Sequence, residues 1–392
     1  MPRPSRSRRI VVALFLTVAV LAGLFVLLAI GLSTTVDGFL TGLMLAVVPV
    51  PIYVAFATWV DRFEPEPPWL LATAFLWGAS IAVLFAMIFN GIGEAVLTEV
   101  AGAASASMLT GVLTAPFFEE LAKGSALLLL FFWRRDEFDN VTDGIIYASM
   151  VGLGFAMTEN VQYYSAAAVA KGGSEAGLLF FLRGVMGPFA HPLFTSMTGI
   201  GLGVARESHR KSVKFFAPLL GLAGAMLLHA VWNLSTNLGL VFFATYFVVM
   251  VPAFIAVIVV AIYSLRREAR IVRSHLESVV ADHVLSADDV IIVTSVRRRI
   301  GASTRALFQG GFGKWIARRR FHALATELAF HSWRTSRYPD PDEAATRAEF
   351  IAGVRAVRAK LGLPLDIEPP DAQLVARLTR ETPLPAMPAP AV

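Results

Sequence analysis

Residues 108–133 read MLTGVLTAPFFEELAKGSALLLLFFW, an apolar stretch long enough to cross a bilayer. Near its middle lie three charged side chains within five residues: Glu119, Glu120 and Lys123. A charged side chain near a bilayer centre costs about 2.5–3.5 kcal/mol, so the three together cost on the order of 8–10 kcal/mol before any pairing. Charges kept at that cost indicate a functional site in this segment.

The rest of the chain has the composition of a membrane protein. Its 392 residues are 56% hydrophobic and only 16% charged, whereas soluble domains average about 25% charged residues. There is no cysteine, which excludes disulfides, thiolate metal sites and a cysteine nucleophile. The net charge of +5 comes without a nucleic-acid-binding motif, so we expect the lipid bilayer and not nucleic acid as the main partner.

Eight apolar runs are each long enough to span a bilayer. We therefore expect an all-α polytopic membrane protein with about eight transmembrane helices, in which residues 10–265 form the membrane domain. The runs lie at 10–32, 38–60, 69–93, 108–133, 144–166, 178–205, 215–239 and 241–265.

Basic residues predict the orientation of these helices. They cluster in alternate loops, whereas the opposite loops hold only Lys171. The clusters are Arg62, then Arg134 and Arg135, then Arg206, Arg210, Lys211 and Lys214, then Arg266 and Arg267. Because cytoplasmic loops carry an excess of Lys and Arg, we expect a multi-pass protein of the cell membrane with both termini, including the basic residues 1–9, in the cytoplasm.

The chain becomes polar after the last apolar run. We expect residues 266–363 to form a helical cytoplasmic region, in which Ser286 with Asp289 three residues later is typical of a helix N-cap. The runs Arg297–Arg299 and Arg318–Arg320 fit either contact with anionic lipid headgroups or solvated helix faces. Residues 364–392 are rich in proline, and we expect them to be disordered.

Three later runs carry further polar residues at a similar predicted depth. Glu159, His191 and His229 each lie about 14–15 residues from the predicted cytoplasmic end of their runs, as Glu119 does. At 1.5 Å per residue this depth is roughly 21 Å. The sequence therefore predicts that four helices bring two carboxylates and two imidazoles to one level, past mid-membrane toward the outside.

These residue types match a known hydrolytic site. Two histidines and a carboxylate, with water in the fourth position, are a common ligand set of catalytic zinc, and a further glutamate can act as general base. The usual His-Glu-x-x-His helix is absent, so the ligands would come from separate helices. The Gly-x-Ser-x-Gly and Gly-x-Gly-Asp motifs of other intramembrane hydrolases are also absent.

The order of the motifs resembles the PrsW-type intramembrane metalloproteases, which are distant relatives of the CAAX prenyl proteases and Abi membrane proteins. The resemblance covers about residues 40–265. It implies that the paired glutamates and the histidines are catalytic or metal-binding, and that the substrate is a membrane-anchored protein such as an anti-sigma factor. The matching motifs are Glu119-Glu120-x-x-Lys123, Asp143-Gly144 leading to Gly154-Phe155-x-x-x-Glu159-Asn160, His191, and His229-x-x-Trp232-Asn233.

We therefore expect an intramembrane endopeptidase in which Glu119 or Glu120 activates a water. Zinc would be bound by His191, His229 and a carboxylate, either Glu159 or the other glutamate of the pair. Asn160 and Asn233 would orient the ligands or hold an oxyanion. Lys123 would neutralise the charge of the glutamate pair.

Three rival interpretations fit the same residues. They could form the proton relay of a proton-coupled transporter, or a protease in which glutamate acts without a metal. A non-enzymatic scaffold that retains the motifs is the third. Nothing in the sequence predicts an oligomeric state.

Overall fold

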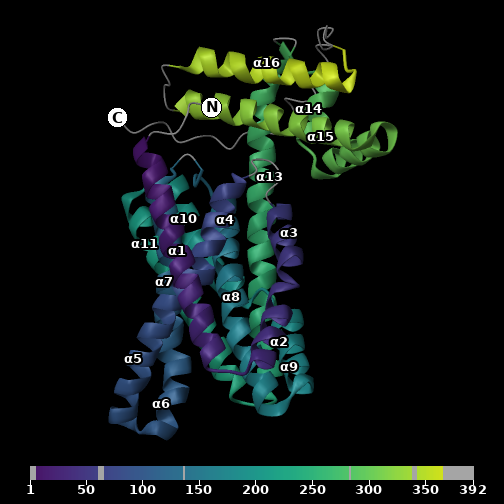
Figure 1. The fold of residues 1–392 in the computed structure, drawn as a ribbon. Coiled ribbons are helices and arrows are strands. Elements are labelled where there is room, and N and C mark those ends of the chain that lie inside the picture. The colour runs from purple at the N-terminus through teal and green to yellow at the C-terminus, as the bar shows by residue number, and fades with distance from the viewer. Residues whose placement is uncertain (1–5, 61–65, 136, 282–283, 338–341, 365–392) are drawn as a thin grey trace. The chain divides into compact units, whose positions relative to one another are not determined.

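The structure is a computed structural model that describes residues 6–60, 66–135, 137–281, 284–337 and 342–364. These residues form helices and no strands (Figure 1), which confirms the all-α prediction. The chain divides into two compact units, one with the helices up to Ile262 and one with the helical residues from Tyr263 on. Residues 1–5, Arg62 and, apart from Pro364, the predicted proline-rich tail lie outside the described residues.

The first unit, here called the membrane unit, is a bundle of long helices in which several π-helical turns interrupt the α-helices. Its elements are α1 (Arg6–Leu32), α2 (Val36–Val47), α3 (Val50–Val60), α4 (Pro68–Leu76), η1 (Trp77–Ala82), α5 (Val83–Ala101), α6 (Ala103–Leu109), η2 (Thr110–Thr114), α7 (Ala115–Trp133), α8 (Val141–Lys171), α9 (Gly173–Phe180), η3 (Phe181–Met186), α10 (Ala190–Glu207), α11 (Lys211–Thr236), α12 (Val241–Thr245), η4 (Tyr246–Met250) and the first part of α13 (Val251–Ala281).

Seven helical segments of the described chain are long and apolar enough to cross a membrane. They match seven of the eight predicted runs. The eighth run, 108–133, contains α7 and is not among the seven, because it carries three charged residues close together and an ordinary membrane span carries at most two. The segment with the costly intramembrane charges is thus the one that differs from an ordinary membrane helix.

Helix α8 lies at the centre of the membrane unit. In its most apolar window 89% of the residues are buried, compared with at most 39% in the other candidate spans. Its first turn is fixed by a capping box, in which the Asn140 side chain accepts from the backbone N–H of Asp143 while the Asp143 carboxylate accepts from that of Asn140. A helix surrounded by others is well placed to carry part of an internal site.

Glycines let α10 pack directly against α8 and α11. A Cβ on Gly152 of α8 would lie 2.6 Å from the backbone nitrogen of Pro192, and one on Gly221 of α11 would lie 2.5 Å from the carbonyl oxygen of Met197. Larger residues would push these helices apart, as expected where small residues line helix interfaces in membranes. This close packing brings His191, the neighbour of Pro192, near the polar residues of α8.

The second unit, here called the C-terminal unit, has its own hydrophobic core. It contains the end of α13, α14 (Ala287–Val293), α15 (Val296–Arg337) and α16 (Glu343–Leu361). Buried side chains such as Leu276, Leu328 and Val354 pack together. Ser286 caps α14 and forms a capping box with Asp289, which confirms the predicted N-cap.

Candidate metal centre

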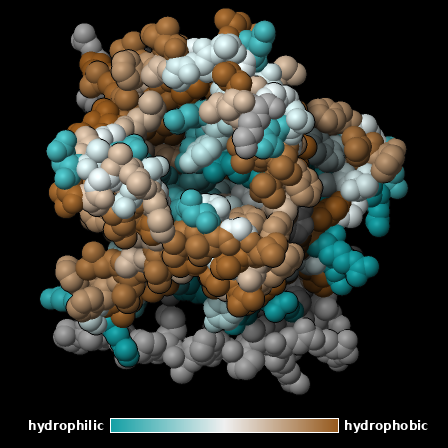
Figure 2. Space-filling view, turned by 90° about the horizontal axis from the view of Figure 1, so that it is seen from below, coloured by the Kyte–Doolittle hydropathy of each residue, from teal (hydrophilic) through white to brown (hydrophobic). Residues whose placement is uncertain are grey.

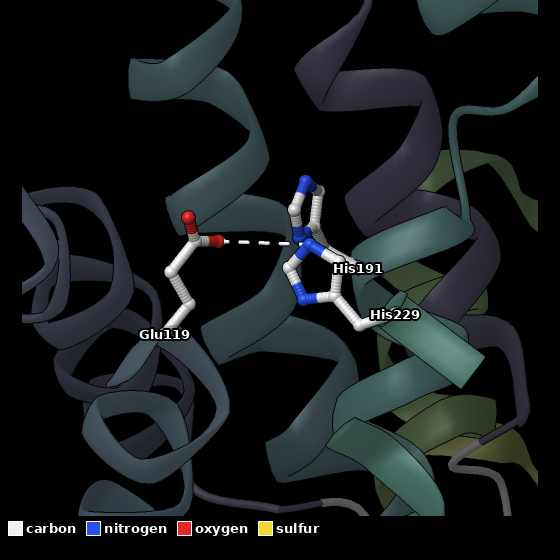
Figure 3. Close-up of side chains that lie close together, drawn as sticks. All are labelled: Glu119, His191 and His229. Atoms are coloured by element: carbon white, nitrogen blue, oxygen red, sulfur yellow. Dashed lines mark ion pairs between the residues drawn. The ribbon is translucent and has the colours of Figure 1, made fainter. Parts of the chain in front are cut away.

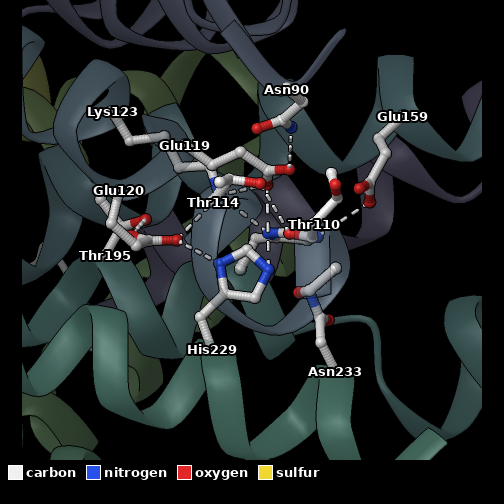
Figure 4. A network of polar contacts seen from close by, with 12 residues as sticks. Asn90, Thr110, Thr114, Glu119, Glu120, Lys123, Glu159, Thr195, His229 and Asn233 are labelled. Carbon is white, nitrogen blue, oxygen red and sulfur yellow. Dashed lines mark hydrogen bonds and ion pairs between the residues drawn. The ribbon is translucent and has the colours of Figure 1, made fainter. Parts of the chain in front are cut away.

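Four helices of the membrane unit bring ionisable side chains into one layer, here called the polar layer (Figure 4). Helix α7 supplies its three charged residues, and α8, α10 and α11 supply one residue each. All except Glu159 are buried. Residues from four separately predicted spans thus lie within hydrogen-bonding reach of one another. The members are Glu119, Glu120, Lys123, Glu159, His191 and His229.

Glu120 is completely buried, and both of its carboxylate oxygens have partners. Oε1 accepts from Lys123 Nζ at 2.8 Å and contacts His229 Nδ1 at 3.0 Å, and Oε2 accepts from the Thr195 hydroxyl at 3.1 Å. A carboxylate that binds one ring nitrogen of a histidine fixes the tautomer and leaves the other nitrogen for a ligand. Glu120 therefore supports His229 and does not itself present a free oxygen.

Both ring nitrogens of His191 also have partners. Nδ1 lies 2.9 Å from Lys123 Nζ, and Nε2 lies 3.0 Å from Glu159 Oε2. An ammonium group has donors only, so Nδ1 offers its lone pair to Lys123 and Nε2 donates to Glu159. The single lone pair of His191 is therefore on Nδ1 and accepts from Lys123, so it can ligate a cation only where Lys123 releases it.

Arg183 adds a seventh, unpredicted member to the six side chains of the polar layer. Its guanidinium, carried by η3, donates to the Glu159 carboxylate and, at 2.7 Å, to Asn160 Oδ1. Both predicted polar residues of α8 are thus held by one arginine from the sixth predicted span. Its charge alone could have identified it as a candidate site residue, since an arginine inside an apolar run is as costly as the glutamates of α7.

Glu119 differs from its neighbour. Its Oε1 accepts from Asn90 Nδ2 at 3.3 Å, but its buried Oε2 has no hydrogen-bond partner among the described residues. This oxygen lies 3.5 Å from Lys123 Nζ and 3.8 Å from His229 Nε2. Figure 3 shows the carboxylate directed at the two imidazoles. Of the two glutamates, Glu119 faces the centre of the layer.

The free oxygen of Glu119 belongs to a group that fits a metal ion. One ligand atom each from Glu119, His191 and His229 lie within 4.8 Å of one another, and all three residues are buried. Counting neutral histidines, the layer has three carboxylates and two cationic side chains, a formal net charge of −1. A carboxylate oxygen without a hydrogen bond among the described residues, two imidazoles and net negative charge are the chemistry expected of a metal site.

The two predicted asparagines lie beside the layer and not at its centre. Asn160 accepts from Arg183, and Asn233 donates from Nδ2 to the carbonyl oxygen of Gly111 in η2, at 2.8 Å. The same π-helical turn carries Thr110, whose buried hydroxyl has no hydrogen-bond partner among the described residues. Asn233 therefore links α11 to a π-helical turn beside the centre of the polar layer. Such turns are often found at functional sites.

Exposure increases across the layer toward Arg183. The side chains of Lys123 and Glu120 are 0% exposed, whereas those of Glu159 and Arg183 are 16% and 20% exposed. Figure 2, seen from below, shows a hydrophilic hollow surrounded by hydrophobic side chains on the same end of the unit at which α9 lies in Figure 1. Water has to reach any hydrolytic site, and the graded exposure indicates the Arg183 side as its route.

Comparisons with known proteins point to one family. Residues 66–257 match the model of the PrsW family intramembrane metalloproteases. The chain is 28% identical to Protease PrsW of Oceanobacillus iheyensis over 204 residues, which cover 52% of this chain and 84% of that relative. It is also 28% identical to Protease PrsW of Bacillus subtilis over 174 residues, 44% of this chain and 72% of that relative. No solved structure matches significantly.

Proposed function

Because the chain belongs to the PrsW family of intramembrane metalloproteases, we propose that it hydrolyses a peptide bond of a membrane-anchored protein at the polar layer. Membership in a protease family favours this function over a proton-coupled transporter or a scaffold. The observation that carries the proposal is the buried Oε2 of Glu119, which has no hydrogen bond among the described residues and faces two imidazoles.

Glu119, His191 and His229 are the residues that would hold zinc. Bound zinc lowers the pKa of a water ligand to about 7 and so supplies hydroxide at neutral pH. Of the two carboxylates considered for the third ligand, Glu119 is favoured because Glu159 is bonded to Arg183 and His191. Asn90 holds the other oxygen of Glu119 and so orients the free one.

The other charged residues position this set. Glu120 and Glu159 each accept from one imidazole and so direct the remaining ring nitrogen inward. Lys123 balances the charge of the glutamate pair, with which it makes contacts of 2.8 and 3.5 Å. Arg183 holds Glu159 in place and balances its charge. In the metal-free alternative, the free oxygen of Glu119 would itself take the proton from water.

The proposed substrate is a single-span protein whose helix unwinds at the layer, and an anti-sigma factor is the class that the family resemblance suggests. We keep the predicted orientation, with both termini in the cytoplasm. Arg206 donates to the carbonyl oxygens of Phe131 and Phe138, so the basic loops at Arg134 and Arg206 lie at the same end of the unit, as the positive-inside rule requires.

One experiment tests the proposal. The full chain and its Glu119→Gln variant are purified, their zinc content is measured by mass spectrometry, and cleavage of a single-span reporter in liposomes is followed. We expect about one zinc per native chain and loss of both zinc and cleavage in the variant. The matched control is Glu99→Gln, an exposed glutamate of α5 outside the layer, which should leave both unchanged.

The outcomes separate the alternatives. Native cleavage without any bound metal would support the glutamate mechanism and overturn the metal site. A Glu119→Gln variant that cleaves at the native rate would overturn the assignment of this residue in either mechanism.

A further inference from the structure

The C-terminal unit carries an exposed apolar and basic projection that the proposed function does not use. Helix α15 is broken at Gly311, which has a φ of +69°, a conformation that favours glycine. Around this break residues 304–316, here called the α15 tip, are exposed except for Ala306 and Trp315, which are half-buried. The break thus produces a turn that projects from the core of the unit.

Large apolar side chains point outward at the α15 tip. Phe308 and Phe312 are 83% and 66% exposed, and Ile316 is 50% exposed. Phe312 stacks on Trp315, with ring centroids 5.0 Å apart. Exposed apolar side chains gathered in one place usually mark an interaction site, and helices that lie on a bilayer surface carry Trp, Phe and Leu on their apolar face.

The charge around the α15 tip has a single sign. Between Val296 and Arg320 the sequence has eight Lys and Arg residues and no Asp or Glu. Arg299 is buried and donates to the carbonyl oxygen of Val293, so it serves the fold. Six of the others are exposed: Arg297, Arg298, Arg305, Lys314, Arg319 and Arg320.

We propose that the α15 tip docks on an anionic lipid surface, with its aromatic side chains in the interface and its basic side chains on the headgroups. Basic charge alone would also fit nucleic acid, but three exposed large apolar side chains fit the apolar boundary of a bilayer better. The C-terminal unit is moreover covalently tethered to the membrane unit, because α13 belongs to both units. The tip thereby fixes the C-terminal unit to the membrane that also holds the substrate.

The absence of cysteine from the chain permits a direct test. Gln309→Cys places one fluorescent label on the α15 tip of the full-length protein and leaves its aromatic and basic residues intact. The protein is reconstituted in liposomes of phosphatidylcholine with or without phosphatidylglycerol, and quenching by acyl-chain spin-labelled lipid is measured. Ala345→Cys, an exposed position of α16, provides the control label.

We expect strong quenching of the Gln309→Cys label in anionic liposomes and weak quenching in neutral ones. A basic residue near an anionic surface changes binding about fivefold. Arg305→Glu with Lys314→Glu should therefore lower the ratio of docked to undocked tip by at least about 25-fold. The same reversal at two exposed positions of α16, Arg355→Glu with Lys360→Glu, should have little effect. Native hydrogen exchange of the core residues of the C-terminal unit shows that each variant is folded.

Several results would overturn the inference. One is quenching at Gln309→Cys no stronger than at Ala345→Cys, and another is equal quenching in neutral and anionic liposomes. In detergent solution, shielding of the label from iodide by added duplex DNA would identify a nucleic-acid surface instead. If the label is shielded from iodide without any DNA, and deletion of residues 365–392 removes that shielding, the chain's own tail is the occupant of the α15 tip.

Discussion

The polar layer of the membrane unit and the polar core of the C-terminal unit both bury charged side chains, but they pair them differently. In the C-terminal unit, Arg358 donates to Asp289 and, at 3.1 and 2.9 Å, to the carbonyl oxygen of Pro364, while Asp289 also caps α14. These charges are bound largely to backbone groups and helix ends. They hold loops and helix termini in place.

In the membrane unit, side chains from α7, α8, α10 and α11 bind one another. Oε2 of Glu119 has no hydrogen bond among the described residues and an ion-pair contact of 3.5 Å with Lys123. A buried acceptor without a partner costs roughly 1–3 kcal/mol or more. A structural network would avoid that cost, as the Asp289 network does. The difference sets Glu119 apart from the Asp289–Arg358 pair. What distinguishes Glu119 from other buried groups without a hydrogen bond in the described part of the chain, such as Arg318 and His322, is that its oxygen faces two imidazoles.

The largest expected effect distinguishes two adjacent glutamates. Glu119→Gln removes the free oxygen and should lower reporter cleavage by about 10²–10⁴-fold, the range for a directly participating carboxylate. Glu120→Gln removes support for His229 and should lower cleavage by only about 10–100-fold, the range for residues that position metal ligands. Initial cleavage rates of the two variants at one total zinc concentration, with the bound zinc measured alongside, check both. A larger loss for Glu120→Gln would reverse the assignment.

The next effect concerns the structural ion pair. Arg358→Ala leaves Asp289 buried without its charged partner and should destabilise the C-terminal unit by about 3–5 kcal/mol. Hydrogen exchange of α14 and α16 in the full chain measures this change. The zinc content of the membrane unit should not change. Arg355→Ala, at a nearby exposed position, should shift stability by no more than about 0.5 kcal/mol.

A smaller effect is expected where the polar layer is partly exposed. Arg183 donates to both Glu159 and Asn160, a fork geometry that lysine does not reproduce. Arg183→Lys should therefore weaken zinc affinity and cleavage together by about 10–100-fold. The exposed Arg210→Lys is the control. Reduced cleavage with native zinc affinity would place Arg183 at the substrate and not behind the ligand set.

The smallest effect lies in the C-terminal unit. Burial and the nearby Arg299 and Arg318 lower the pKa of His322 to about 3. The folded pKa lies below the unfolded value of about 6.5, so the unfolded chain binds the proton first as the pH falls. The free energy of unfolding is therefore unaffected by His322 above pH 6.5 and decreases as the pH drops from there toward 3. From pH 7 to 5 the loss should be about 1–2 kcal/mol.

Hydrogen exchange of α15 at the two pH values, corrected for intrinsic rates, checks this prediction. His322→Gln should abolish that part of the pH dependence. A slope that persists in the variant would show that other groups titrate instead.

Much of the site could be predicted from the sequence because the bilayer makes intramembrane charges conspicuous. Glu119, His191 and His229 were placed at one depth by counting residues along apolar runs, and in the structure they lie together. The choice between Glu119 and Glu120 could not be made in this way. Adjacent helix positions point about 100° apart, and which direction faces the site depends on how α7 packs against its neighbours.

Two residues of the site were missed for a related reason. Arg183 and Asn90 lie inside predicted spans, yet neither belongs to a recognised motif. Their roles follow from what they touch, Glu159 and Asn160 for the arginine and Glu119 for the asparagine. Such contacts between distant segments have no signature in the sequence, and the π-helical turn that presents Arg183 has none either.

The sequence by itself determined that this protein is a bundle of membrane helices with charges in its interior, because the length and hydropathy of the runs reflect the thickness and low polarity of a bilayer. The motif order also indicated the family. Only the tertiary structure decided which oxygen is free, which histidine nitrogen faces it and which carboxylates act as supports. Those choices depend on helix rotation and close packing at glycines, and packing is a property of the assembled bundle.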